Sequence, residues 1–373
     1  ACRGDRGRPP PPRPPPHPSD PSRKHSSLIR TASCAPTTTA APPTPALDPD
    51  AAAHLAAEPL LTPRAALPPL ATPPPKVTGL FAMATAAMRT PDLISVPVPI
   101  GFHEPLSELQ QRAEDYEYVE LLNQAAEKAA GSLARHLLVA AFALSAYAGV
   151  HRVGRPFSSL LGETYELVRP DLGFRFLAEK VAHAPRAVNR ATAEAAAGWR
   201  LDTEDELAAA MSGTTIVLAP AFLARLRFAD GDAYTWGKAA TCVHGALLGP
   251  RHMWVQHKGT VAVASTVTDA VVTLEIGRGW GRRNRDVSGR ARTAGGADAG
   301  LALRGAWDAR LEAVDDDTGE VALLWACASG DGKGCRHTMT RWTASLNAPP
   351  RSRPAVPPPP ASDARHRSDM RAL

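Results

Sequence analysis

The sequence predicts a mainly β protein that begins with a helical layer and continues as a large antiparallel sheet or barrel. Three observations predict this class: the distribution of proline, two stretches with helical spacing after Pro105, and a series of short alternating runs after Pro156. Residues 1–100 hold 24 of the 37 prolines, whereas residues 101–346 hold six. Because proline removes an amide donor and clashes with the preceding turn, the N-terminal quarter is excluded from ordinary helices and central strands.

Two helices are expected between these prolines. Apolar residues recur at helical spacing over residues 106–122, and Ser107 is placed to cap the first turn. A second helix fits residues 125–148, whose apolar residues make one broad face. The apolar run over residues 137–150 has 14 residues, which is too short to cross a bilayer. Core packing accounts for both helices.

Short strands follow, separated by Gly, Asp, Asn and Pro. Apolar residues alternate with polar or charged ones in these runs, as on a half-buried strand. The expected strands cover residues 174–176, 214–218, 222–228, 253–255, 261–263, 272–276, 301–303, 307–311 and 321–325, with a turn at 230–232. Since no helical pattern intervenes, an antiparallel sheet or barrel is favoured over a parallel sheet.

One domain is expected over residues 83–346. Residues 1–82 and 347–373 are rich in proline and lack apolar periodicity, so both are predicted to be disordered. The Arg-, Ser- and Thr-rich opening also loosely resembles an organellar transit peptide. It has no clear amphipathic helix, and a disordered extension is the favoured interpretation.

Charge and chemistry exclude several function classes. The formal net charge is +5 and the pI is near 9.1, which suits anionic membranes or nucleic acid without selecting either. The five cysteines form no C-x-x-C pair, which disfavours a disulfide framework or a cysteine-rich zinc site and favours a reducing compartment. Walker, GxSxG and HExxH motifs are absent, so we expect neither an enzyme nor a cofactor nor a metal.

A basic cluster is formed by Arg278, Arg282, Arg283, Arg285, Arg290 and Arg292. Two interpretations stay open. The cluster is either a solvated loop between strands or a contact surface for lipid phosphates. Nucleic acid is disfavoured because few aromatic residues stand nearby to stack on bases.

Two local sequences carry far more specific information about function than the basic cluster does. RPFSSLLGETYE over Arg155–Glu166 and EKVAHAP over Glu179–Pro185 closely resemble KPFNPLLGETYE and EQVSHHPP, the signature segments of the oxysterol-binding protein family. Residues 230–244 and 303–311 resemble later family segments in the same order, so the resemblance covers roughly residues 90–330. We interpret Gly162 and Glu163 as structural: a glycine where backbones crowd and an acid that binds nearby backbone.

The resemblance implies a near-closed antiparallel β-barrel with an N-terminal helical layer, a lid and a lipid tunnel. The tunnel would hold one sterol or phospholipid, and a basic pocket at its mouth would take a phosphoinositide headgroup. Many family members exchange the two ligands between apposed membranes. The implied protein is a non-enzymatic lipid carrier, cytoplasmic and peripherally associated with anionic membranes, with no nucleic-acid partner.

The headgroup ligands carried over from the family are Arg155, Ser158 and His183, with Arg186 as a further cation. Arg155 replaces lysine and keeps the charge, while Ser158 replaces asparagine with a shorter hydroxyl. Ala184 stands where the family has a second histidine, and Arg186 replaces a proline. The family's basic and acidic C-terminal helix has no counterpart, so the domain is expected to be incomplete there. The resemblance therefore implies weakened phosphoinositide recognition.

A second function class stays open. The altered signature also fits a degenerate barrel that no longer transfers lipid and acts as an interaction or regulatory protein. The Pro-rich segments would then recruit partners.

Overall fold

A computed structural model describes residues 93, 96, 98, 100–184, 186–246, 248, 252–279, 281, 284–327 and 339–347. All of them lie in the compact unit Pro43–Leu373. The segments predicted to be disordered, 1–82 and 347–373, lie outside the described residues apart from Asn347. The boundaries of the predicted domain, 83–346, therefore stay a prediction.

The described elements run from a helical N-terminal part into a long series of strands. In chain order they are η3 (Ile100–Phe102), β1 (His103–Ser107), α4 (Glu108–Ala113), η4 (Glu114–Tyr116), α5 (Glu120–Ala126), α6 (Leu133–Ser145), β2 (Arg155–Phe157), β3 (Thr164–Arg169), β4 (Phe174–Ala182), β5 (Val188–Ala195), β6 (Trp199–Ser212), β7 (Thr215–Phe228), β8 (Ala233–Trp236), β9 (Ala240–His244), β10 (Trp254–Ser265), β11 (Val271–Ile276), β12 (Asp286–Arg292), β13 (Asp298–Ala306), β14 (Arg310–Asp315), β15 (Val321–Ala326) and α7 (Arg341–Ser345). Among the described residues, no helix is long and apolar enough to cross a membrane.

The strands from β3 to β15 form one sheet of 13 strands. Its order is β15-β14-β13-β12-β11-β10-β8-β7-β6-β5-β4-β3, and β9 pairs with both β10 and β7. Every pair within this sheet is antiparallel, whereas β1 and β2 form a separate parallel pair. The predicted mainly β, antiparallel class is confirmed.

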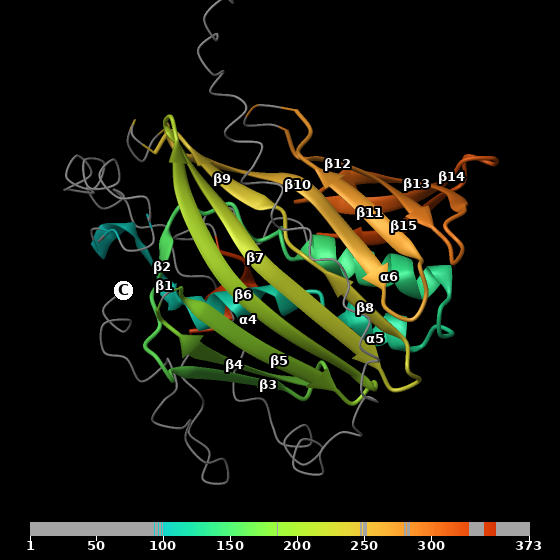
Figure 1. The fold of residues 1–373 in the computed structure, drawn as a ribbon, viewed down its shortest axis with the longest axis horizontal. Coiled ribbons are helices and arrows are strands. Elements are labelled where there is room, and N and C mark those ends of the chain that lie inside the picture. Colours follow the sequence, from blue (N-terminus) through green and yellow to red (C-terminus); the bar gives the residue numbers. More distant parts are fainter. Residues whose placement is uncertain are drawn as a thin grey trace, which may run out of the picture. The chain divides into compact units, whose positions relative to one another are not determined.

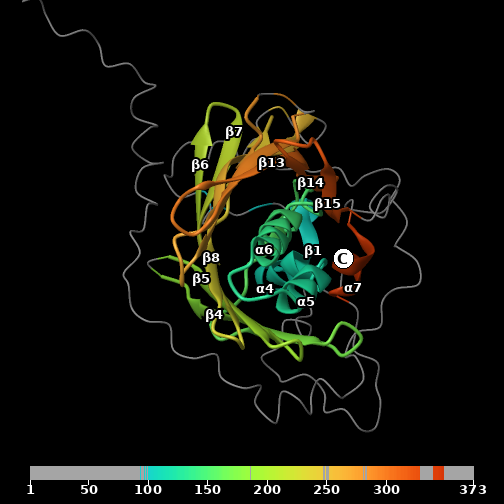
Figure 2. The ribbon, with the colours of Figure 1, turned by 90° about the vertical axis from the view of Figure 1, so that its right-hand side faces the viewer.

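The sheet curls around the N-terminal helices as a near-closed barrel (Figure 1). Figure 2 shows α4, α5 and α6 within the curve, with α7 between β15 and the β3–β4 side. Contacts of Trp342 in α7 explain this position. Its indole NH donates to the carbonyl of Ala113 at 3.0 Å, and the guanidinium of Arg169 at the end of β3 lies 4.9 Å from its ring centre. A short helix thus covers the side on which the sheet does not close.

The first helix begins where the sequence predicts and the second does not. Ser107 forms a capping box with Gln110, so the predicted cap is confirmed. The helix expected over residues 125–148 is wrong in its first turns. Gly131 adopts a left-handed backbone with φ of 67°, and Ser132 caps a new helix that starts at Leu133. α5 already ends at Ala126, and the left-handed glycine followed by a Ser cap turns the chain into the new helix.

A buried arginine anchors the start of α6. The Arg135 guanidinium lies 2.7 Å from the carboxylate of Asp230 and 3.2 Å from that of Asp232. These acids belong to the turn predicted at 230–232, between β7 and β8. Because only 1% of the Arg135 side chain is exposed, its charge requires this neutralisation. The helical layer is thereby tied to the sheet.

Two strands that the sequence predicts separately form a single strand in the structure. The sequence suggested separate strands at 253–255 and 261–263 around Lys258 and Gly259, but β10 runs through both. Its first half pairs with β9 and its second half with β11. The strand changes partner at Gly259, whose Cα lies so near Ala239 that an added Cβ would be 3.3 Å from its methyl group.

The basic cluster is not one loop. Arg290 and Arg292 lie on β12, and Arg282 and Arg283 lie outside the described residues. Three members have carboxylate partners: Arg278 pairs with Glu275, Arg285 with Asp308 and Arg290 with Asp316. These pairs reduce the positive charge that the cluster offers to lipid phosphates.

Two buried side chains, Glu114 and His257, have pKa values far from their usual ones. Arg152 bridges the carboxylates of Glu104 and Glu114 at 2.7 and 2.6 Å. Burial, which outweighs the attraction of Arg152, raises the pKa of Glu114 to about 7. His257 on β10 is 1% exposed and lies edge-on to Trp307. Burial lowers the pKa of His257 to about 3.

These two groups are expected to oppose each other as pH changes. A raised acid pKa contributes stability below about 4.5 that is lost as pH rises toward 7. A lowered histidine pKa contributes stability above about 6.5 that is lost as pH falls toward 3. Between about pH 4.5 and 6.5 their slopes cancel in the parent protein.

His257→Gln should therefore make the free energy of unfolding fall with rising pH in this window, by about 1.4 kcal/mol per pH unit relative to the parent. Glu114→Gln should change the slope of the unfolding free energy against pH by the same amount in the opposite direction. Denaturant unfolding at several pH values measures both slopes. Curves that stay parallel to the parent would show that neither group titrates as described.

Candidate functional site

The two signature segments pair directly with each other. Thr164 of β3 faces Glu179 of β4 in the antiparallel ladder. The ladder continues beyond β3, because the amide of Gly162 donates to the carbonyl of Lys180 at 2.9 Å and the amide of Lys180 donates to the carbonyl of Glu163 at 3.0 Å. Segments that are separate in sequence thus form one structural unit.

The turn before β3 is held by its own acid. The Glu163 carboxylate accepts a bond from the amide of Leu160 at 2.8 Å, and the amide of Glu163 donates to the Leu160 carbonyl at 2.9 Å. Gly162 has φ of 77°, a conformation that glycine adopts without steric cost. The role predicted for Glu163 is confirmed. The crowding predicted at Gly162 is wrong, because a Cβ there would meet nothing within 4 Å, and the left-handed backbone alone explains this glycine.

Arg155 and Ser158 come just before this turn. Arg155 on β2 is half-buried, and its guanidinium donates to the carbonyl of Val96 at 3.0 Å. Ser158, also half-buried, follows the end of β2. His103 pairs with Arg155 in the β1–β2 register, and burial, reinforced by the charge of Arg155, lowers the pKa of His103.

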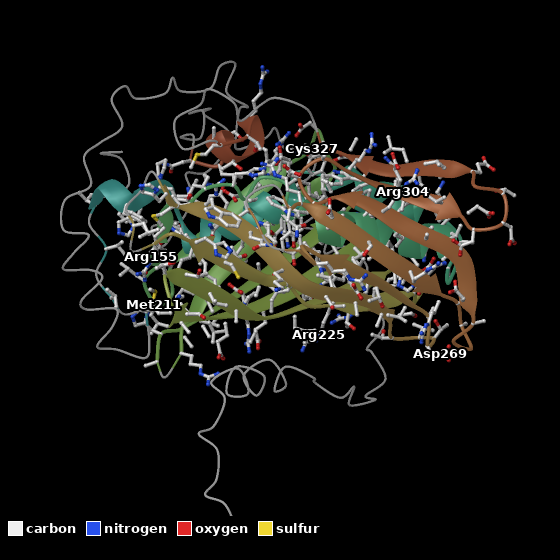
Figure 3. All side chains as sticks on the ribbon, turned by 90° about the horizontal axis from the view of Figure 1, so that it is seen from above. Arg155, Met211, Arg225, Asp269, Arg304 and Cys327 are labelled. Carbon is white, nitrogen blue, oxygen red and sulfur yellow. The ribbon has the colours of Figure 1, made fainter. Side chains whose placement is uncertain are left out.

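Arg155 marks one end of the barrel. Figure 3 shows it on the same side as Met211, near the tip of the β6–β7 hairpin, and far from Asp269. Residues of the preceding segment pack on this hairpin, where Val96 joins an apolar cluster with Ala209 and Met211. Arg155 therefore links the N-terminal segment, the hairpin end and the signature.

His183 and Arg186 stand at the same end of β4 and β5. His183 directly follows β4 and is exposed, as is Ala184. The Arg186 side chain is 71% exposed and pairs with Glu206 of β6. Arg155 belongs to the separate β1–β2 pair, with Ser158 just after β2, and His183 follows β4, while the charge of Arg186 is paired with the Glu206 carboxylate. The joint role of these four residues stays a prediction.

Lys180 was missed by the sequence reasoning. It is 1% exposed, and its ammonium lies 2.7 Å from the carboxylate of Glu108 at the start of α4. Two signals could have found it. The family segment EQVSHHPP has glutamine at this position, and period-two alternation places Lys180 on the inward face with Phe176 and Ala178.

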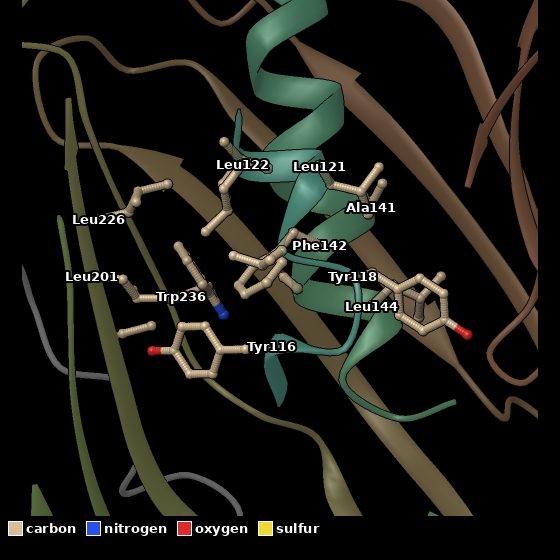
Figure 4. Packing of buried hydrophobic residues seen from close by; sticks show 14 of the residues in the cluster. Tyr116, Tyr118, Leu121, Leu122, Ala141, Phe142, Leu144, Leu201, Leu226 and Trp236 are labelled. Atoms are coloured by element: carbon tan, nitrogen blue, oxygen red, sulfur yellow. The ribbon is translucent and has the colours of Figure 1, made fainter. Parts of the chain in front are cut away.

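An internal cavity lies between the helices and the sheet. It lies beside η4, α6 and strands β6, β7 and β8 and leaves about 10 Å³ of free space, about enough for one water-sized sphere. Its wall is mostly apolar and includes Phe142, Leu201, Phe222 and Trp236. Figure 4 shows three of these side chains, Phe142, Leu201 and Trp236, close to Tyr116. This free volume is far below the roughly 300–1,000 Å³ of typical small-molecule sites.

A few polar groups reach this apolar wall. The Lys238 ammonium lies 2.5 Å from the Asp115 carboxylate and 4.6 Å from the centre of the Phe222 ring. The Tyr116 hydroxyl is buried, and within the described part of the chain it has no hydrogen-bond partner. Burial raises the pKa of Tyr116 well above its usual value, so the phenol stays neutral. The chemistry of this lining, though not its free volume, suits a largely apolar ligand that carries one polar group.

Lys180→Met should destabilise the protein by about 2–3 kcal/mol, because it leaves the Glu108 carboxylate without its partner. The loss is smaller than for a fully buried pair, since 19% of the Glu108 side chain is exposed. Lys180→Met with Glu108→Gln should recover most of it. Denaturant unfolding of both single variants and the double variant gives the coupling energy. A coupling near zero would show that the pair does not join β4 to α4.

The similarity of this chain to a known family extends beyond the two signature segments. Residues 83–373 match the sequence model of the family described as oxysterol-binding protein. Oxysterol-binding protein-related protein 1C of Arabidopsis thaliana is 34% identical over 297 residues, which cover 76% of this chain and 36% of the relative. The chain therefore spans only about a third of that relative's length.

Solved structures show the same fold. Osh3 ORD from Saccharomyces cerevisiae, solved in complex with PI(4)P, superposes with a TM-score of 0.69 and 26% identity, covering 84% of this chain and 81% of that one. The Osh1 ORD domain, solved with cholesterol, gives 0.70 and 28%, covering 83% and 77%. The same Osh1 domain was also solved with ergosterol.

Proposed function

Because the chain belongs to the oxysterol-binding protein family, we propose that it binds a sterol or phospholipid inside the barrel and transfers it between membranes without enzymatic chemistry. The observation that carries the proposal is the direct pairing of the two signature segments at one end of a barrel that contains an apolar cavity. The ligands of the Osh3 and Osh1 structures support the same ligand classes.

The physical argument rests on burial. A sterol-sized ligand that buries on the order of 400 Å² of apolar surface gains roughly 10 kcal/mol at about 25 cal/mol per Å². Immobilising the ligand and ordering its surroundings consume much of this gain. Tyr116 and the Lys238–Asp115 pair are the groups that would satisfy a ligand hydroxyl at the cavity.

The size of the cavity supports the second function class as well. About 10 Å³ of free space cannot hold a sterol, so the lining must separate for uptake. A barrel that stays closed would be an interaction or regulatory protein that transfers no lipid. Lipid extraction from vesicles by the purified protein separates the two functions.

We further propose that headgroup recognition is weak and uses Arg155, Ser158 and His183, with a smaller part for Arg186. Arg155 is shared with the Val96 carbonyl, and Arg186 with Glu206. Ala184 supplies no polar group. Each lost charge-assisted bond removes roughly 1.5–3 kcal/mol, so weak binding follows. Such a carrier would act in the cytoplasm with peripheral contact to anionic membranes.

Ala143→Leu, which places a larger side chain in the cavity wall, should abolish saturable binding of a fluorescent sterol. Overpacking is expected to cost about 1–3 kcal/mol of stability, which a folded barrel tolerates. Ala270→Leu, in the turn before β11, is the matched control and should bind like the parent. Equal sterol binding by all three proteins would place the ligand elsewhere. Absence of binding by the folded parent would favour the interaction protein.

Ala184→His should strengthen binding to vesicles that contain a phosphatidylinositol phosphate by about tenfold, because it restores one charge-assisted bond. Arg155→Ala should abolish most of the remaining binding. Arg225→Ala removes an equal charge from the exposed face of β7 and serves as the control. If the parent binds tightly and only the control variant weakens binding, these residues do not form the headgroup site.

A further inference from the structure

Two neighbouring leucines project from the signature turn. Leu160 and Leu161 are 64% and 66% exposed, the largest values among the exposed large apolar side chains of the described residues. Single exposed leucines are common on protein surfaces. Two in succession, on a turn whose backbone is fixed, call for a physical reason.

The turn holds these leucines outward without packing them. Its backbone groups are bonded to the Glu163 side chain and to Lys180 on β4, as described above. Glu163 is itself 6% exposed, so the turn is fixed from inside by a buried acid. The conformation therefore does not depend on what the leucine side chains contact, and they are free to meet an external surface.

Their surroundings combine apolar and phosphate-binding chemistry. Leu160 lies two residues after Ser158 and five after Arg155 in the sequence. The ladder of β3 and β4, extended past Thr164 and Glu179, brings the turn alongside the end of β4 and the exposed His183. Apolar tips thus stand at the same end of the barrel as side chains suited to phosphate.

Other exposed apolar residues lie at the same end. Ile100, 62% exposed, stands three residues before His103, which pairs with Arg155. Leu248, 61% exposed, follows β9, whose residues pair with the outer half of β7. The surface at this end is therefore more apolar than a solvated rim requires.

We propose that Leu160 and Leu161 insert into the interfacial region of a lipid bilayer and seat this end of the barrel on the membrane. A bilayer presents phosphates directly above its hydrocarbon, which matches leucine tips beside Arg155 and His183. The nearby Glu179 is exposed, so Coulombic attraction is limited and apolar insertion carries the contact. The inference rests on the proposed function, since it assigns the contact surface of the same headgroup site.

The test is co-sedimentation with phosphatidylcholine vesicles, with and without a phosphatidylinositol phosphate. Leu160→Gln with Leu161→Gln should reduce vesicle binding about tenfold on both vesicle types. Val321→Gln with Leu323→Gln is the matched control, because these side chains on β15 are 47% and 60% exposed. The control should bind like the parent, and all three proteins should melt at the same temperature.

Binding of a water-soluble inositol phosphate separates this inference from the headgroup proposal. The leucine variant should bind it as the parent does. If no protein binds it while vesicle binding still depends on the leucines, the headgroup site fails and the membrane contact stands. The contact is overturned if the leucine variant sediments with vesicles like the parent, if the control loses as much, or if the parent does not bind vesicles. It is also overturned if the parent is a dimer and the leucine substitutions act only by converting this dimer to a monomer.

Discussion

The ring of Tyr116 joins the helical layer to the sheet, and the rest of the structure depends on this contact. It stacks on Phe174 at 5.8 Å and tilts against Phe176 at 5.1 Å, both on β4, and it meets Phe142 of α6 edge-on at 5.9 Å. A curled sheet of this length buries its concave face only if something fills it. The helices fill it, and the cavity is the space left beside Tyr116.

Buried ion pairs fix two helices of the same layer at their first turns. Arg135 ties α6 to the β7–β8 turn, while Lys180 ties β4 to α4. Such pairs contribute little net stability compared with apolar packing, but removing one partner is costly. Their effect is to set register: the helical layer has one orientation in the barrel, and the signature strand is held against it.

This arrangement places two chemistries along one axis. Apolar burial lies inside the barrel around Phe142 and Trp236, and the proposed polar recognition lies at the end that carries Arg155 and His183. Arg155 also bonds Val96, so the N-terminal segment and a bound phosphate would compete for one guanidinium. Under the proposed function, ligand exchange at the barrel end and contact with a bilayer would therefore be physically linked.

Local residue patterns determined the strand at Phe174 and Phe176, the helix cap at Ser107, the turn at 230–232 and the two signature segments, because each depends on neighbours in sequence. The sequence alone could not show that Lys180 meets Glu108, that β10 is one strand, or that the Tyr116 hydroxyl faces a cavity. Nor could it show that Arg290 lies on a strand and pairs with Asp316. Each of these depends on residues distant in the chain, and only the tertiary structure decided which distant groups share the low-dielectric interior and which share the surface.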